Sequence, residues 1–251
     1  MNRPFAIHVK TYFCACILSI ASVALRAQDS TKATTTQVQI TNVRVGAVSI
    51  AIPSPTNDLV EPGPDYRVIF ETLAPVINRL VAAFVPQNKI DAIHKGNAPP
   101  MDEYALVEVA RRTEFAEIDS STFQQIAEVL GKQFGEDISQ FSSKSQEEIN
   151  RNLKAQGNSV SVTIDKPVPL GIFFVMKNAI GVGSITPYNV NGVTTRNVGC
   201  LALLRVRGRV LSVFTYAAYK DEGTVTWVKT TSEQWASAIL KANEGPSGPS
   251  Q

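Results

Sequence analysis

The stretch GCLALLRVRGRVLSVFTYAAY, at residues 199–219, decides the fold. It consists of two apolar limbs on either side of Arg207-Gly208, which is the pattern of two strands joined by a tight turn. The first limb has apolar side chains on both faces, and a strand that is covered on both faces lies inside a sheet. The sequence therefore predicts a hairpin at the centre of a sheet. One face of that limb presents Ala202, Leu204 and Val206, and the other presents Leu201 and Leu203.

Further strands are predicted from alternating side chains and turn residues. Asn191-Gly192 is a typical two-residue hairpin turn, so one strand precedes it and another follows it. Periodicity does not separate strand from helix at 80–85, and we predict a strand there because Pro86 ends the run so soon. The other predicted strands are the segments 43–52, 104–111, 160–164 and 172–177.

Helices are predicted where a capping residue precedes apolar side chains at helical spacing. A short helix is expected from Asp65 to Leu73, and residues 53–64 and 87–102 are expected to be loops because they are rich in Pro, Gly and Asn. The elements together predict an α+β fold, a mostly antiparallel sheet flanked by helices, in a single domain at 43–243. The three capping boxes are Ser121 with Gln124, Ser145 with Glu148, and Thr230 with Glu233, and they open helices that end near residues 135, 155 and 243.

The first 27 residues have the pattern of a secretory signal peptide. Arg3 and Lys10 make the start basic, an apolar stretch follows at 11–25, and small residues end the segment. Such a stretch reaches only about 22 Å as a helix, which is shorter than a hydrocarbon core of about 30 Å. We predict cleavage after Ala27, with Ala24 as the alternative. The mature protein is then expected to be periplasmic or secreted, in a bacterium, without stable membrane insertion.

The two ends of the mature chain are predicted to be disordered. Residues 28–42 form a polar, Thr-rich lead-in, and residues 244–251 form a tail of Gly, Pro and Ser. Between them we find no internal repeat and no linker that would divide the chain into two domains.

Loss of the signal peptide changes the charge and the cysteine content. The whole chain has 24 basic and 22 acidic residues, and three of the basic residues but none of the acidic ones lie in the signal. A nearly neutral mature chain gives no electrostatic basis for nucleic-acid binding, so nucleic acid is not an expected partner. Cys200 becomes the single cysteine, which excludes an internal disulfide. Its apolar surroundings predict a buried and unreactive thiol.

Few side chains of the usual catalytic kinds remain. His94 is the single histidine of the mature chain, which excludes a zinc site with several histidines. With Asp91 three positions before it, and with a loop serine, His94 forms the basis of one alternative, a hydrolase. A solvated loop histidine is the favoured interpretation, since no Gly-x-Ser-x-Gly motif supplies the nucleophile. We predict no catalytic residue, no metal and no cofactor.

Three further features carry weaker signals. Gly181 and Gly183 lack the other residues of a nucleotide-binding loop and are expected to allow a bend or a close approach of strands. Three arginines surround the tip of the central hairpin, where their guanidinium groups are able to converge on a carboxylate or phosphate. Edge protection or pairing with acidic residues is the other interpretation of them. The arginines are Arg205, Arg207 and Arg209. Trp227, Tyr216 and Tyr219 are candidates to line a groove nearby, but core packing is the favoured interpretation of them.

The order of the elements resembles the Mog1/PsbP-like α/β/α sandwich. That order is a strand, a Pro-rich loop, two strands, a helix, the long hairpin at 201–219 and a final helix that begins with Trp235. It is also similar to that of uncharacterised exported bacterial proteins of the same shape. The resemblance covers residues 43–243 through element order alone, and it transfers no functional residue. It implies a role in binding or assembly instead of catalysis.

We therefore expect an exported, soluble, periplasmic protein that acts as a non-catalytic binding or envelope-assembly module with a protein partner. Two alternatives remain open. One is the hydrolase that uses His94 and Asp91, and the other is a binder of a small anionic ligand. The second alternative would use Arg205, Arg207 and Arg209 as its ligand-binding residues.

Overall fold

The computed structural model describes residues 38–64, 67, 70–71, 74–95, 102–134, 138–155 and 161–244. The predicted signal peptide, residues 28–37 of the predicted lead-in, and the tail from residue 245 lie outside the described residues. So does Asp65, the predicted cap of a short helix. Of that helix the structure describes Pro64, Arg67, Phe70 and Glu71 as helical.

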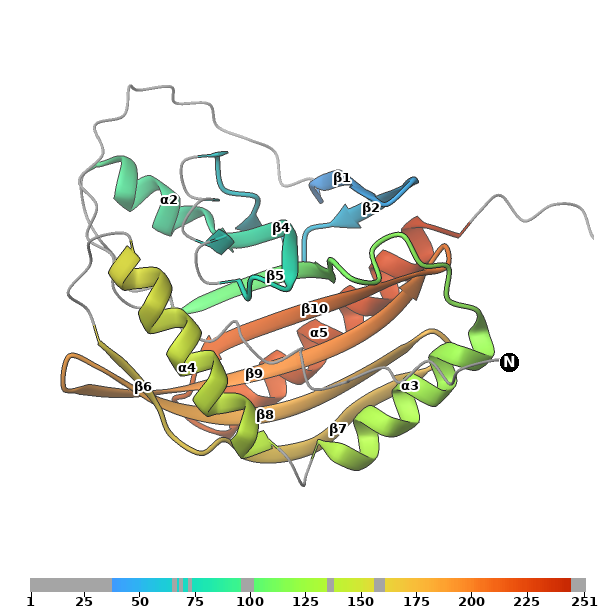
Figure 1. The fold of residues 1–251 in the computed structure, drawn as a ribbon. Helices are drawn as coiled ribbons and strands as arrows, with labels where there is room; N and C mark the ends of the chain where they lie inside the picture. Colours follow the sequence, from blue (N-terminus) through green and yellow to red (C-terminus); the bar gives the residue numbers. More distant parts are fainter. Residues whose placement is uncertain are drawn as a thin grey trace, which may run out of the picture.

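An eight-stranded sheet forms the centre of the fold (Figure 1). Its order is β3-β4-β5-β10-β9-β8-β6, and β7 also pairs with β8, so that all the neighbours are antiparallel. This is the α+β class that the sequence predicts. The strands are β3 (Leu59–Val60), β4 (Asn78–Pro86), β5 (Glu103–Ala110), β6 (Val162–Ile164), β7 (Val168–Met176), β8 (Ala179–Val190), β9 (Val193–Val206) and β10 (Arg209–Ala218).

The predicted hairpin is in the middle of this sheet. β10 lies between β5 and β9, and β9 lies between β10 and β8. Both turns have a positive φ at each of their two residues, 51° and 89° at Asn191-Gly192 and 47° and 75° at Arg207-Gly208. Those torsions match the right-handed twist of the adjoining strands. Both hairpin predictions, and the strand prediction for 80–85, are therefore confirmed.

The predicted strand at 43–52 is wrong in one respect, because it is a hairpin. β1 (Ile40–Val45) and β2 (Val48–Pro53) pair with each other in a separate two-stranded sheet. Gly46 makes the turn with a φ of 57°. The residues around Gly46 are small or apolar on both faces, so the alternation does not reveal that the chain reverses there. β1 also begins three residues before the predicted domain start at 43.

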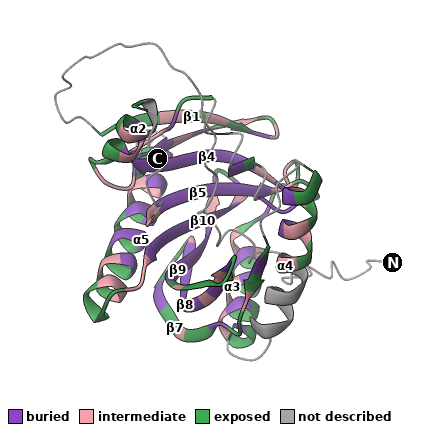
Figure 2. Ribbon diagram, turned by 90° about the vertical axis from the view of Figure 1, so that its left-hand side faces the viewer, coloured by how far each residue is buried: buried purple, intermediate pink, exposed green. Residues whose placement is uncertain are grey.

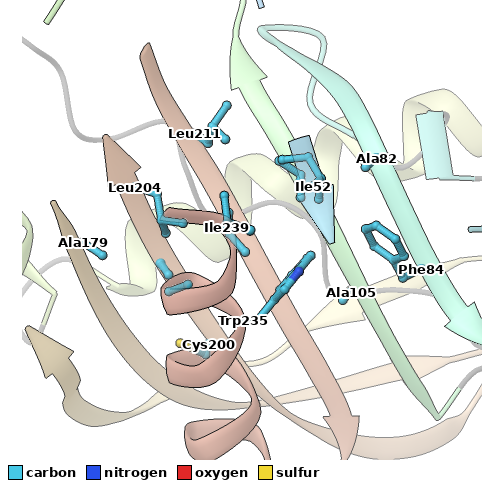
Figure 3. Close-up of a cluster of buried hydrophobic side chains, with 14 of the residues drawn as sticks. Ile52, Ala82, Phe84, Ala105, Ala179, Cys200, Leu204, Leu211, Trp235 and Ile239 are labelled. Carbon is cyan, nitrogen blue, oxygen red and sulfur yellow. The ribbon is translucent and has the colours of Figure 1, made fainter. Parts of the chain in front are cut away.

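One face of the large sheet is covered by α5 (Glu222–Ala242) and by the β1–β2 hairpin. Trp235 and Ile239 of α5 point into the core, and the ring of Trp235 meets Phe84 edge-on at a centroid distance of 5.6 Å (Figure 3). The indole of Trp235 donates to the carbonyl of Pro53 at 2.6 Å. This bond fixes the helix to the end of β2.

The opposite face is covered by α3 (Ser120–Gln133) and α4 (Ile138–Ala155) (Figures 1 and 2). Phe123, Ile126 and Leu130 of α3 are buried against the sheet. α4 is longer than predicted, and its Ile149 and Leu153 are buried in a small cluster beside β6 and β8. The sheet is thus enclosed between helices on both sides.

Several predicted helix starts are wrong. α3 is capped by Asp119, whose carboxylate accepts from the amide of Thr122 at 2.7 Å, and not by Ser121. α5 begins eight residues before Thr230, where Asp221 and Thr224 form a capping box. The sequence contains polar residues at each of these positions, so more than one of them is able to cap the helix.

The two predicted loops contain regular structure. β3 lies within 53–64, and its Leu59 is fully buried. α2 (Gln87–His94) occupies the first half of 87–102, directly after β4. Its own residue Ile90 is buried, and the side chain of Gln87 donates to that of Asp91 one turn later at 2.8 Å. The loop prediction failed because the Gly and Pro residues on which it depended come only after position 95.

Candidate functional site

The arginines at the hairpin tip each hold a different segment of the chain. Their guanidinium groups donate mostly to backbone carbonyls, which is a structural use of the side chain. Arg205 and Arg209 are bonded to residues of the segment between β5 and α3, whereas Arg207 is bonded to β2 and to the end of α5. The bonds are Arg205 Nε to Ile118 O at 2.6 Å, Arg205 Nη1 to Asn178 Oδ1 at 3.4 Å, Arg207 Nε to Asn243 O at 3.2 Å, Arg207 Nη1 to Ser49 O at 3.2 Å, and Arg209 Nη1 to Phe115 O at 3.2 Å.

These bonds do not direct the three guanidinium groups to one point. Arg209 has a buried Nε atom that lacks a hydrogen-bond partner among the described residues. Binding of an anion at this tip remains a prediction.

His94 and Asp91 lie on a helix and not in a loop. Asp91 is exposed and accepts from Gln87, and His94 is the last residue of α2. The predicted hydrolase, which placed His94 in a loop, remains untested.

Two ionisable side chains of kinds that enzymes use in catalysis are buried. Cys200 is covered, as predicted, and its burial raises the pKa of the thiol to about 12, so the reactive thiolate does not form at neutral pH. Glu108 is also fully buried, and desolvation raises the pKa of its carboxyl to about 7. Asn78 donates to Glu108 Oε2 at 2.7 Å, which offsets part of that rise. Neither group reaches solvent, so neither meets a substrate in this structure.

The structure does not bring Trp227, Tyr216 and Tyr219 together in a groove. Tyr216 faces α3, where its ring lies 6.0 Å from that of Phe214 and nearly parallel to it. Trp227 and Tyr219 pack against the α5 face of the sheet. The sheet separates Tyr216 from the other two, because successive side chains of a strand point to opposite faces. Core packing, the favoured interpretation, is confirmed for Tyr216.

The margin of the sheet at β7 is the most unusual surface among the described residues. β7 pairs with β8 and with no other described strand, so its outer side has no neighbour there (Figure 1). Val168, Ile172 and Val175 are 54%, 51% and 68% exposed. An open strand edge that carries apolar side chains is a ready template for another strand. We call Val168–Met176, with the flanking Lys166 and Lys177, the β7 edge.

Glycines of β8 explain how β7 is attached. A Cβ atom at Gly183 would overlap the ring of Phe173, and one at Gly181 would overlap the ring of Phe174. The two rings therefore lie directly on the backbone of β8. The predicted close approach at these glycines is the approach of aromatic rings, and it buries Phe173 and Phe174 while their neighbours stay exposed.

The ends of the β7 edge are basic. Lys166 and Lys177 are exposed, and neither takes part in the ion pairs of the described residues. All residues between them are uncharged. Lysines beside an open strand discourage unwanted pairing of that strand.

Sequence reasoning missed this edge, although a signal was present. It predicted strands at 160–164 and 172–177 and none between them, whereas Pro169 is the second residue of β7. Proline inside a strand is confined almost entirely to sheet edges. A proline within an uncharged run that ends in lysines is therefore a pattern that predicts an exposed edge.

Within the described residues, no group of three or more His, Cys, Asp or Glu residues is placed to hold a metal ion. None of the described helices combines the length and the apolar character needed to cross a bilayer.

No family model and no curated protein matches the sequence. The structure is similar to that of the Ran-binding protein Mog1p from Saccharomyces cerevisiae, with 7% sequence identity and a TM-score of 0.30. The match covers 82% of this chain and 95% of that one. The likeness is one of fold alone, and the function is argued below from the residues of this chain.

Proposed function

We propose that the protein is an exported binding module that holds a protein partner along the β7 edge and does not catalyse a reaction. The observation that carries the proposal is the open, apolar margin of the sheet at β7. A strand that exposes Val168, Ile172 and Val175 has a cost in water that a partner would remove.

The position of the reactive groups supports binding over catalysis. Glu108 and Cys200 are shielded from solvent on opposite faces of the sheet. Asp91 is exposed, and its described bond is to Gln87 of its own helix. Both reactive groups are therefore internal, whereas three large apolar side chains of a single open strand are exposed at the β7 edge.

A photo-crosslinking experiment tests the binding role. A benzophenone amino acid is placed at Val175 of the full chain, and a matched variant carries it at Lys229, which is exposed on α5. We expect irradiation of the native cells to give a discrete adduct from position 175 and none from 229. Absence of an adduct at 175, or the same adducts from both positions, would overturn the proposal.

Export rests on the signal peptide at residues 1–27. We expect the protein recovered from cells to begin at Gln28, or at Leu25 if cleavage follows Ala24, and to be found outside the cytosol. N-terminal sequencing of fractionated cells measures this directly. A chain that begins at Met1 in the cytosolic fraction would remove export from the proposal.

Anion binding at the hairpin tip is a second candidate, supported by the buried and unpartnered Nε atom of Arg209. A small oxyanion would accept from that donor once binding had opened the covering segment. Inorganic phosphate at about 100 times its dissociation constant would add about 2.7 kcal/mol to the stability of the folded state. We expect a rise in melting temperature that is lost in Arg209→Gln. If neither phosphate nor sulfate raises it, this candidate is wrong.

A further inference from the structure

We infer that the β7 edge takes an extended apolar segment of a protein partner that has acidic residues at both ends, and that the segment adds to the sheet as a further strand. This inference rests on the proposed function and specifies its ligand. The backbone, the exposed side chains and the charges of the edge support it.

One edge of the β7 backbone is not paired with any described strand. In an antiparallel pair, every second residue directs its N–H and C=O groups away from its neighbour. Because β7 pairs only with β8 among the described strands, those outward groups face no described strand. Pro169 has no N–H group, so an added strand would pair with the stretch from Ile172 to Met176, in which the register with β8 shifts by one residue at Phe173.

The exposed side chains of that stretch are apolar and lie on one face. Ile172 is opposite Val182, and Val175 is opposite Ile180, and both partners belong to the core on the α3 side of the sheet. A residue directly across from Ile172 or Val175 in an added strand would meet an apolar surface. The complementary segment therefore alternates apolar residues on the side that faces α3.

The charges define the ends of the ligand. Lys166 and Lys177 are eleven positions apart, which is about 36 Å along an extended chain. Ten consecutive uncharged residues separate them. Both ammonium groups lack an acidic partner among the described ion pairs. A segment that spans the edge and ends in Asp or Glu would satisfy both of them.

The same charges argue against a second copy of this chain as the occupant. A two-fold pairing of β7 with itself is antiparallel and places Lys166 of one copy near Lys177 of the other. Like charges directly across a strand pair are destabilising. An acid-ended strand has the opposite sign at both ends, so the observations favour that partner.

Defined peptides test the inference on the full chain. The probes are the fluorescent peptides EETVTVTVTVTEE and KKTVTVTVTVTKK, and fluorescence anisotropy measures their binding. We expect the acid-ended peptide to bind at least tenfold more tightly than the lysine-ended one. The double variant Lys166→Glu/Lys177→Glu should reverse that preference, whereas Lys229→Glu/Lys241→Glu on α5 should leave it unchanged. A preference that is the same in all three proteins overturns the inference.

Hydrogen exchange distinguishes strand addition from simple charge attraction. With the acid-ended peptide bound, amides of residues 172–176 should exchange more slowly. An acid-ended peptide with N-methyl groups on alternate amides should bind at least tenfold more weakly. Tight binding without protection of β7, or equal binding of the N-methylated peptide, overturns strand addition.

The experiments distinguish failure of the binding role from failure of the inferred ligand. An adduct at Val175 together with no preference for acidic ends leaves the binding role in place and overturns the inferred ligand. Absence of both the adduct and peptide binding overturns both. A concentration-dependent dimer whose formation protects residues 172–176 would show that a second copy is the occupant, and would also overturn the inferred ligand.

Discussion

Glu108 is a carboxyl inside an apolar sheet, and its surroundings determine its protonation. Asn78 donates to Glu108 Oε2, while Glu108 Oε1 and Asn78 Oδ1 are buried acceptors without a hydrogen-bond partner among the described residues. A proton on Glu108 turns one of two unsatisfied acceptors into a donor. The neutral acid therefore suits this position better than the carboxylate does.

The free energy of unfolding should consequently fall as pH rises from the pKa of an unfolded glutamate to about 7, the pKa of Glu108 in the folded protein. Burial holds the pKa of Glu108 at about 7 in the folded protein, above the value near 4.3 of an unfolded glutamate. A raised folded pKa gives stability that is complete below the unfolded pKa and is lost as pH rises through the folded one. The loss expected by pH 8 is on the order of 3 kcal/mol. Urea unfolding at a series of pH values measures it.

Glutamine at this position removes the dependence. Glu108→Gln keeps the shape and stays neutral, so its stability should be flat between pH 5 and 8 and should exceed that of the wild type at pH 8. The matched change Glu233→Gln, at an exposed residue of α5, should leave the pH profile of the wild type intact. A Glu108→Gln profile that falls with pH as the wild type does would contradict this account.

At the scale of elements, β7 is attached by aromatic rings that lie on glycine. We expect Gly183→Ala to displace the ring of Phe173 and to reduce stability by about 1–3 kcal/mol, as overpacking of a core typically does. Amides of β7 should exchange faster in this variant than in the wild type, and the increase should be larger than for amides of β9. Gly63→Ala serves as the control, because nothing lies within 4 Å of the added Cβ there. Equal stability of the two variants would show that the rings move aside freely.

A buried indole of the final helix contributes to holding the β1–β2 hairpin, beside the two hydrogen bonds between Asn243 and Ala51. Trp235→Ala removes the contact with Phe84 and the bond to the carbonyl of Pro53, so we expect a loss of about 3–5 kcal/mol. Trp227→Ala, at a half-buried position of the same helix, should cost clearly less. Chemical unfolding followed by circular dichroism compares the two variants. A larger loss for Trp227 would contradict the packing described for α5.

At the scale of the whole molecule, we expect Lys166 and Lys177 to prevent the β7 edge of one copy from pairing with that of another. Removing both charges in Lys166→Val/Lys177→Val leaves an apolar strand edge with no repulsion between copies. We expect this variant to self-associate at concentrations at which the wild type does not, as measured by light scattering after size exclusion. The control variant Lys229→Val/Lys241→Val removes the same charge from α5 and should behave as the wild type. Self-association of the control to the same extent would show that net charge, and not the edge, is responsible.

Prediction from the sequence was most successful where structure depends on a few adjacent residues. Asn191-Gly192 and Arg207-Gly208 indicate their hairpins because the required left-handed torsions are a local property. It failed where the same stretch of sequence is compatible with more than one local structure. Thr230 and Asp221 are both competent helix caps, and only the length of β10 and the packing of α5 select Asp221. The one-strand prediction at Gly46 failed because the adjoining residues suit either face.

The candidate site was beyond the sequence for a related reason. Whether a strand has one neighbour or two depends on pairings between residues far apart in the chain, and so does the partner of Glu108, which is Asn78, 30 positions away. The sequence by itself determined the central hairpin, the antiparallel class and the burial of Cys200, since alternation and turn chemistry act over a few residues. Only the tertiary structure decided that β7 is an open edge and that Glu108 is enclosed, because exposure and solvation are set by what the rest of the chain places beside a residue.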